Sequence, residues 1–146
     1  MIRPSQEEFE ALTTRGNLIP VVREILADLD TPLSTYLKLV RTQKESHYSY
    51  LLESSQGGEK WGRYSIIGLP AKTILTVRGN DIQVRYKGEL TETAQHDDPL
   101  VFVEQYQKRF KVAPVEGLPR FYGGLVGYFA YDTVTHGPLI GLTIKY

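Results

Sequence analysis

Residues 50–68, YLLESSQGGEKWGRYSIIG, hold the side chains of this sequence that are best placed to do chemistry. Glu53, Ser54 and Ser55 directly follow an apolar run, and Arg63 comes after a glycine pair and the single tryptophan. A carboxylate and hydroxyls at the end of a strand can hold an ammonium group, and a guanidinium can bind a carboxylate through charge-assisted hydrogen bonds. Together these groups would match the two charges of a free amino acid.

A plain hairpin explains the same residues. Glu53 and Arg63 could pair across two neighbouring strands, and such a pair contributes well under about 1 kcal/mol when it is exposed. The residue pattern alone favours this structural interpretation over an amino-acid site, and at this level both stay open.

Other catalytic and ligand-binding patterns are missing from the sequence. The histidines do not have the spacing of a metal site, and the chain has no cysteine to complete one. There is no G-x-x-x-x-G-K-[ST] phosphate loop, and the glycines of residues 123–127 do not form G-x-G-x-x-G. Asp97 and Asp98 are better explained by the start of a helix than as paired catalytic acids. We therefore expect no catalytic residue, metal site or cofactor in this chain.

Composition excludes several classes of protein. The chain has 146 residues, of which 41% are hydrophobic and 23% charged, which is enough for one domain with a core. Its 17 basic and 17 acidic residues cancel, so no net charge attracts nucleic acid or an anionic membrane. The lack of an apolar signal region, of a long apolar span and of cysteine favours a cytoplasmic location and no membrane partner.

Residue periodicity predicts an α+β fold with a mostly antiparallel sheet and flanking helices. Three helices are expected to begin at the capping residues Ser5, Thr31 and Asp98, the last two of which precede a proline. The apolar stripe of the third helix is expected on Leu100, Val103, Tyr106 and Phe110.

Strands are expected where the apolar period becomes two. Residues 48–53 and 61–67 are predicted to form a hairpin around Gly57-Gly58, and residues 73–77 and 82–86 a clearer one around residues 79–81. Residues 120–132 are predicted to form a buried strand whose glycines allow another backbone to approach closely.

Four stretches carry a resemblance to a known family: NLIP at residues 17–20, ILADLDTPLSTYLKL, YSYLLESSQGGEKWGRYSIIG and RFYGGLVGYFAYD. Over residues 5–134 the chain resembles the N-terminal region of anthranilate synthase component I. The L-L-E-S element followed by G-R-Y-S is specific, whereas G-G-L-V-G-Y-x-x-Y-D is shared with other chorismate-using enzymes, including aminodeoxychorismate synthase. The resemblance implies that the chain is part of a larger two-layer fold.

The same resemblance implies a function. The full enzyme converts chorismate to anthranilate and pyruvate with Mg2+, using ammonia delivered by a glutamine amidotransferase subunit. Its N-terminal region binds L-tryptophan as feedback inhibitor, and carried over to this chain Leu52, Glu53 and Ser54 would line that site, with Arg63 as its basic residue. Residues 123–132 would pack between this region and the catalytic part.

The catalytic acids and Mg2+ ligands of the family belong to a C-terminal chorismate-binding region that this chain does not contain. We therefore expect the chain to be inactive alone. Two alternatives are the N-terminal region of aminodeoxychorismate synthase component I and a stand-alone amino-acid-binding module.

The last residues depart from the family, which continues with an acidic segment where this chain has THGPLIGLTIKY. Residues 1–134 are expected to form the regulatory region and residues 135–146 an atypical tail, produced by a truncation or a frameshift. A strand over residues 139–146 would be an exposed edge without its partner.

Overall fold

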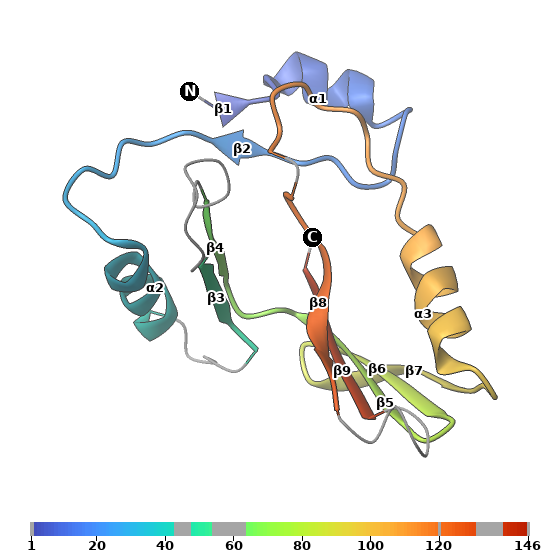
Figure 1. Ribbon diagram of the computed structural model, residues 1–146. Coiled ribbons are helices and arrows are strands. Elements are labelled where there is room, and N and C mark those ends of the chain that lie inside the picture. The colour runs from blue at the N-terminus through green and yellow to red at the C-terminus, as the bar shows by residue number, and fades with distance from the viewer. Residues whose placement is uncertain (1, 43–47, 54–63, 120, 131–138, 146) are drawn as a thin grey trace. The chain divides into compact units, whose positions relative to one another are not determined.

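The chain forms two compact units (Figure 1), and the computed structural model describes residues 2–42, 48–53, 64–119, 121–130 and 139–145. One unit is made of residues 1–26 and 73–146, and the other of residues 27–72. The larger unit holds strands β1 (Ile2–Arg3), β2 (Val22–Arg23), β5 (Thr73–Arg78), β6 (Asp81–Tyr86), β7 (Glu89–Gln95), β8 (Gly124–Phe129) and β9 (Leu139–Lys145), with helices α1 (Gln6–Leu12) and α3 (Pro99–Lys108). The smaller unit holds α2 (Pro32–Arg41), β3 (Tyr50–Glu53) and β4 (Ser65–Gly68). The predicted α+β class with antiparallel sheets is confirmed.

The main sheet has five antiparallel strands in the order β7-β6-β5-β9-β8. The predicted hairpin of β5 and β6 is confirmed, and its turn is closed by Gly79 at a φ of 58°. The next turn places Lys87 and Gly88 at φ values of 51° and 86° and leads into β7, a strand that residue periodicity does not predict.

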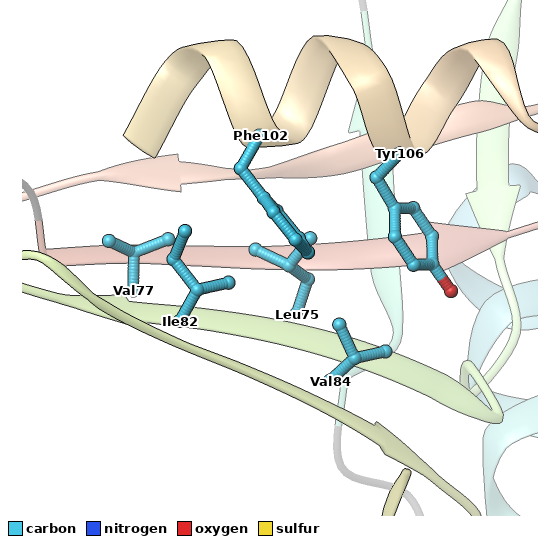
Figure 2. Close-up of a cluster of buried hydrophobic side chains, with 6 residues drawn as sticks. All are labelled: Leu75, Val77, Ile82, Val84, Phe102 and Tyr106. Carbon is cyan, nitrogen blue, oxygen red and sulfur yellow. The ribbon is translucent and has the colours of Figure 1, made fainter. Parts of the chain in front are cut away.

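Helix α3 and the two central hairpin strands make the core of the larger unit. Leu75 and Val77 of β5 and Ile82 and Val84 of β6 are almost free of solvent and share one face of the sheet. Phe102 and Tyr106 of α3 point down onto these side chains (Figure 2). A helix and a sheet that each bury one apolar face are the smallest arrangement that makes a core.

The stripe of α3 differs from the expected one. Phe102 is 7% and Tyr106 8% exposed, whereas Leu100 is 49% exposed. Val103 and Phe110 are partly buried against the core. The buried stripe is therefore rotated away from Leu100 toward Phe102, because the large ring fills the space above β5 and β6.

All three helices begin at the predicted capping residues. The Ser5 hydroxyl accepts the backbone N–H of Glu8 at 3.3 Å, and the Glu8 carboxylate accepts that of Ser5 at 2.7 Å. This second bond holds the pKa of Glu8 below its usual value. Thr31 makes an equivalent capping box at the start of α2, and Asp98 accepts the backbone N–H of Leu100 at 3.0 Å. Asp98 is thus a cap, as the sequence indicated.

Strand β8 is not the buried strand that was predicted. Among the described residues it pairs with β9 alone and forms one edge of the sheet. Tyr128 is 68% and Phe129 59% exposed. The apolar composition that suggested burial is present, but only Leu125 packs against the core.

Strand β9 lies in the tail for which an exposed edge was expected, and that expectation is wrong. The strand pairs with β5 over residues 139–144 and with β8 over residues 140–145. Its backbone is therefore bonded on both sides. The division of the chain at residues 134 and 135 stays a prediction.

The segment after α1 is fastened to the end of α3 by Asn17. Its side-chain amide donates to the carbonyl of Arg109 at 2.6 Å, and its side-chain carbonyl accepts the backbone N–H of Lys111 at 2.7 Å. The backbone N–H of Asn17 donates to the carbonyl of Lys111 at 2.9 Å. The NLIP stretch thus begins with a side chain that satisfies backbone groups left open where a helix ends.

Arg109 also connects α3 to the β7 edge of the sheet. Its guanidinium donates two hydrogen bonds to the carboxylate of Glu92, at 2.6 and 2.7 Å, and lies over the rings of Tyr106 and Phe102. These bonds hold the pKa of Glu92 below its ordinary value of 4.5. A carboxyl with a lowered pKa stabilises the fold above that value and loses its contribution as the pH falls through the lowered one.

We predict that Glu92→Gln lowers the free energy of unfolding at pH 7 by up to about 1 kcal/mol, allowing for solvent screening of a partly exposed pair. The loss should shrink as the pH falls below 4.5, because the wild-type carboxyl then becomes protonated. Urea denaturation followed by circular dichroism at several pH values measures this. Glu104→Gln is the matched control, since its pair with Lys108 is exposed and worth only about 0.3 kcal/mol. Equal losses for both variants at every pH would contradict the prediction.

Candidate functional site

The predicted amino-acid site begins at the loop end of the β3–β4 hairpin. The two strands are antiparallel, with Leu52 opposite Ile66 and Glu53 opposite Ser65. Glu53 is the last residue of β3, and its carboxylate accepts a hydrogen bond from the Ser65 hydroxyl at 3.5 Å. Both residues are exposed. The acid expected at a strand exit therefore lies there, next to a hydroxyl from the returning strand.

Leu52 precedes this acid and is 48% exposed. Because side chains alternate along a strand, Leu52 shares a face with Tyr50, and Glu53 shares the other with Leu51. The end of the hairpin thus offers an apolar side chain and a carboxylate in succession. Ser54 and Arg63, the two other predicted site residues, lie outside the described residues, as does the predicted turn at Gly57-Gly58.

The hairpin is shorter than the sequence predicted. Strand β3 begins at Tyr50, because Tyr48 has a φ of 62° and cannot continue a strand. Strand β4 begins at Ser65 in place of residue 61. Four residues on each strand are paired, from Tyr50 with Gly68 to Glu53 with Ser65.

An aromatic ring packs over a glycine at the end of this hairpin that lies away from its loop. Gly68 is buried, and a Cβ added to it would lie 2.0 Å from the ring of Tyr50 on the opposite strand. Burial of the ring raises the pKa of the Tyr50 hydroxyl. A tyrosine across from a glycine covers the backbone that the glycine, without a side chain, leaves bare. This contact fixes the register that places Glu53 at the exit.

Helix α2 contacts the start of β3 through a polar bond. The hydroxyl of Tyr36 lies 2.9 Å from that of Ser49, just before the strand. The ammonium of Lys38 donates to Asp30, just before the helix, at 2.6 Å, and this bond holds the pKa of Asp30 below its usual value. Sequence reasoning missed the Tyr36–Ser49 bond, because the two residues belong to different elements and no local pattern links them.

The described residues contain no group of three or more histidine, aspartate and glutamate side chains that could hold a metal ion. No helix within them is long and apolar enough to cross a membrane.

The chain resembles proteins named anthranilate synthase component 1. It is 53% identical to that of Pseudomonas putida and 54% identical to that of Pseudomonas aeruginosa, each over 133 residues that make up 90% of this chain. It is 44% identical to that of Aquifex aeolicus over 130 residues. This chain is homologous to an N-terminal fragment of anthranilate synthase component I. No family model matches it.

The matched region is a small part of those relatives. It covers 26% of the Pseudomonas proteins and of the Aquifex protein. Because these relatives carry the name anthranilate synthase, the resemblance to anthranilate synthase component I is favoured over one to aminodeoxychorismate synthase. The resemblance to the family is thereby confirmed.

We predict that Gly68→Ala destabilises the smaller unit by about 2 kcal/mol, because the new methyl group must displace the Tyr50 ring. Hydrogen exchange of the amides of Leu51 and Ile67 measures the local opening free energy. The control repeats the substitution in a Tyr50→Ser background, where the ring is absent and the further loss should be small. An equal loss in both backgrounds would show that the ring is not the cause.

Proposed function

We propose that this chain is the N-terminal, tryptophan-sensing region of an anthranilate synthase component I and that it is catalytically inactive by itself. The observation that carries the proposal is the identity of 53–54% over 90% of the chain to proteins of that name, of which it covers only 26%. In the parent enzyme, chorismate would be converted to anthranilate and pyruvate by the part that lies outside this chain.

The chemistry at the end of the hairpin supports a site for a free amino acid. The Glu53 carboxylate beside the Ser65 hydroxyl can accept hydrogen bonds from an α-ammonium group. The half-exposed Leu52 supplies apolar surface for an indole ring. Arg63 would bind the α-carboxylate, and Ser54 would add a hydroxyl to the ammonium side.

Feedback inhibition requires that tryptophan bind two states of the enzyme unequally. The hairpin is suited to this role because its paired part is short and its register is fixed by Tyr50 and Gly68. A ligand bound by Glu53, Ser54 and Arg63 would act on the loop end of the hairpin without shifting the Tyr50–Gly68 end.

The remaining partners follow from the parent enzyme. The proposed partners are L-tryptophan and a glutamine amidotransferase subunit that delivers ammonia, and the proposed location is the cytoplasm. The described residues do not fit a Mg2+ site, since they hold no cluster of three acidic or histidine side chains. In the parent enzyme, the Mg2+ ligands would lie in the part beyond this chain.

A stand-alone amino-acid sensor is the second candidate, favoured by the exposure of Glu53 and Leu52 in the hairpin itself. An enzyme fragment would need the rest of the parent enzyme to complete its tryptophan pocket, whereas a sensor would complete the pocket within this chain. Saturable calorimetric binding of tryptophan to this chain, lost in Glu53→Ala and Ser54→Ala, would favour the sensor over the enzyme fragment.

We predict that the isolated chain forms no anthranilate from chorismate, Mg2+ and ammonia, because it carries no candidate acid–base pair. Anthranilate fluorescence is the readout, and the full-length Pseudomonas aeruginosa enzyme is the positive control. Steady fluorescence growth that depends on chorismate and scales with the concentration of this chain would refute the prediction.

We predict that a full-length Pseudomonas aeruginosa enzyme, with its matched segment replaced by this chain, is inhibited by tryptophan. Glu53→Gln and Ser54→Ala should each raise the half-inhibitory tryptophan concentration about tenfold, since each removes a hydrogen bond to the ammonium group. The kcat and the KM for chorismate should stay near those of the parent chimera.

Glu89→Gln, an exposed acid on β7, is the matched control and should leave tryptophan inhibition unchanged. Full inhibition of the Glu53→Gln chimera at the same tryptophan concentration as the parent would exclude a role for this carboxylate.

A further inference from the structure

Helix α2 packs on the β3–β4 hairpin with little apolar burial. None of its residues is buried, and its apolar side chains Leu33 and Leu37 are about half exposed. A two-stranded hairpin is at best marginally stable by itself and needs another element to pack against. Among the described residues of the smaller unit that element is α2, which contacts both strands (Figure 1). Because apolar burial is small here, a directional bond between helix and strand has more influence on how the two are placed.

A hydrogen bond between two hydroxyls joins the helix to the strand. The Tyr36 hydroxyl, from the middle of α2, lies 2.9 Å from the hydroxyl of Ser49, just before β3, and the pair is partly buried. A hydroxyl bond of this length has ordinary strength and depends on direction. It therefore fixes one point of the hairpin to one point of the helix.

The helix end of this bond is well anchored. Thr31 and Ser34 cap the start of α2 through reciprocal bonds of 3.0 and 3.1 Å. Asp30 accepts hydrogen bonds from the Ser34 hydroxyl at 2.8 Å and from the Lys38 ammonium at 2.6 Å. These bonds span the turns of the helix in which Tyr36 lies. Tyr36 thus projects from a segment that is stabilised by bonds of its own.

The strand end of the bond is connected to the candidate site through β3. Glu53 follows Ser49 by four residues, about 13 Å along an extended chain. Each residue from Tyr50 to Glu53 is paired with β4, so Glu53 and Ser65 move together with the strand. A change in how Ser49 is held on the helix therefore displaces the carboxylate and the neighbouring hydroxyl as a unit.

We propose that Tyr36 is a positioning residue for tryptophan binding: through Ser49 it holds the hairpin in the placement in which Glu53 and Ser65 meet the ammonium group of the ligand. This role rests on the proposed function, because it concerns the site assigned there to tryptophan. A bond made within the protein arranges the site in advance, and a preorganised site binds more tightly because less freedom is lost on binding. Tyr36 acts through Ser49 and not by contact with the ligand.

The chimera of the Pseudomonas aeruginosa enzyme that carries this chain tests the proposal. Tyr36→Phe keeps the ring and removes only the hydroxyl, and it should raise the half-inhibitory tryptophan concentration about fivefold, the equivalent of one hydrogen bond. Each value is measured relative to the activity of the same variant without tryptophan. Tyr86→Phe, the same change at an exposed tyrosine of β6, is the matched control and should leave tryptophan inhibition unchanged.

A double-mutant cycle separates positioning from a general loss of stability. Ser49→Ala should weaken inhibition at least as much as Tyr36→Phe, and adding Tyr36→Phe to it should have little further effect, because both changes remove the same bond. Ser49→Thr keeps a hydroxyl and should be inhibited like the parent chimera. Each variant needs the circular dichroism spectrum of the parent chimera, and Ser49→Ala supplies an independent readout if Tyr36→Phe does not fold.

Three outcomes would overturn the role of Tyr36 alone, in a chimera whose inhibition Glu53→Gln weakens. They are unchanged inhibition of Tyr36→Phe, an equal weakening by Tyr86→Phe, and effects of Tyr36→Phe and Ser49→Ala that add in full. The proposed function would fail differently. A parent chimera that tryptophan does not inhibit, or whose inhibition Glu53→Gln leaves unchanged, would overturn the proposed site and the role of Tyr36 with it.

Discussion

The packing of α3 on the β5–β6 hairpin is the constraint on which the larger unit depends. Four aliphatic side chains of the hairpin are nearly solvent-free only because the rings of Phe102 and Tyr106 cover them. The two rings also stack on each other, with centroids 6.1 Å apart. Burial of a large apolar side chain contributes about 1.5–3 kcal/mol, so six such residues provide most of the stabilisation available to this unit.

The polar contacts of the same unit gather where α3 ends, and they follow from that packing. Once Tyr106 is buried, Arg109 is held one turn further on, over the ring and within reach of Glu92. The adjoining backbone groups are then taken up by Asn17. The position of α3 thus determines where Arg109 holds β7 and where Asn17 holds the segment before β2.

Local signals in the sequence predicted the elements that local forces determine. The predictions of the three helix caps and of the Gly79 turn were correct, because each feature depends on hydrogen bonds or φ values within four residues. Strand β7 was not foreseen, since its two glutamates and its alanine have weak strand propensity and its pairing with β6 decides its conformation. The edge position of β8 and the paired position of β9 depend on strand partners that are distant in sequence, which periodicity does not reveal.

In the candidate site, too, local features were predicted from the sequence and contacts between strands were not. Period-two spacing correctly placed Glu53 at a strand exit and Leu52 beside it. The Tyr50–Gly68 contact that sets the register was not expected, because a ring over a glycine on another strand has no signal within either strand. That Ser54 and Arg63 belong to the same site as Glu53 stays a prediction from family resemblance, since both lie outside the described residues.

The bonds made by Asn17 have a consequence for the order in which the chain folds. Their partners are 92 and 94 residues away, so they close a long loop and form only after the helix that presents them. The β5–β6 hairpin, by contrast, closes over a two-residue turn. During synthesis, residues 1–26 therefore leave the ribosome before α3 has formed. They can pack into the larger unit only after that helix is in place.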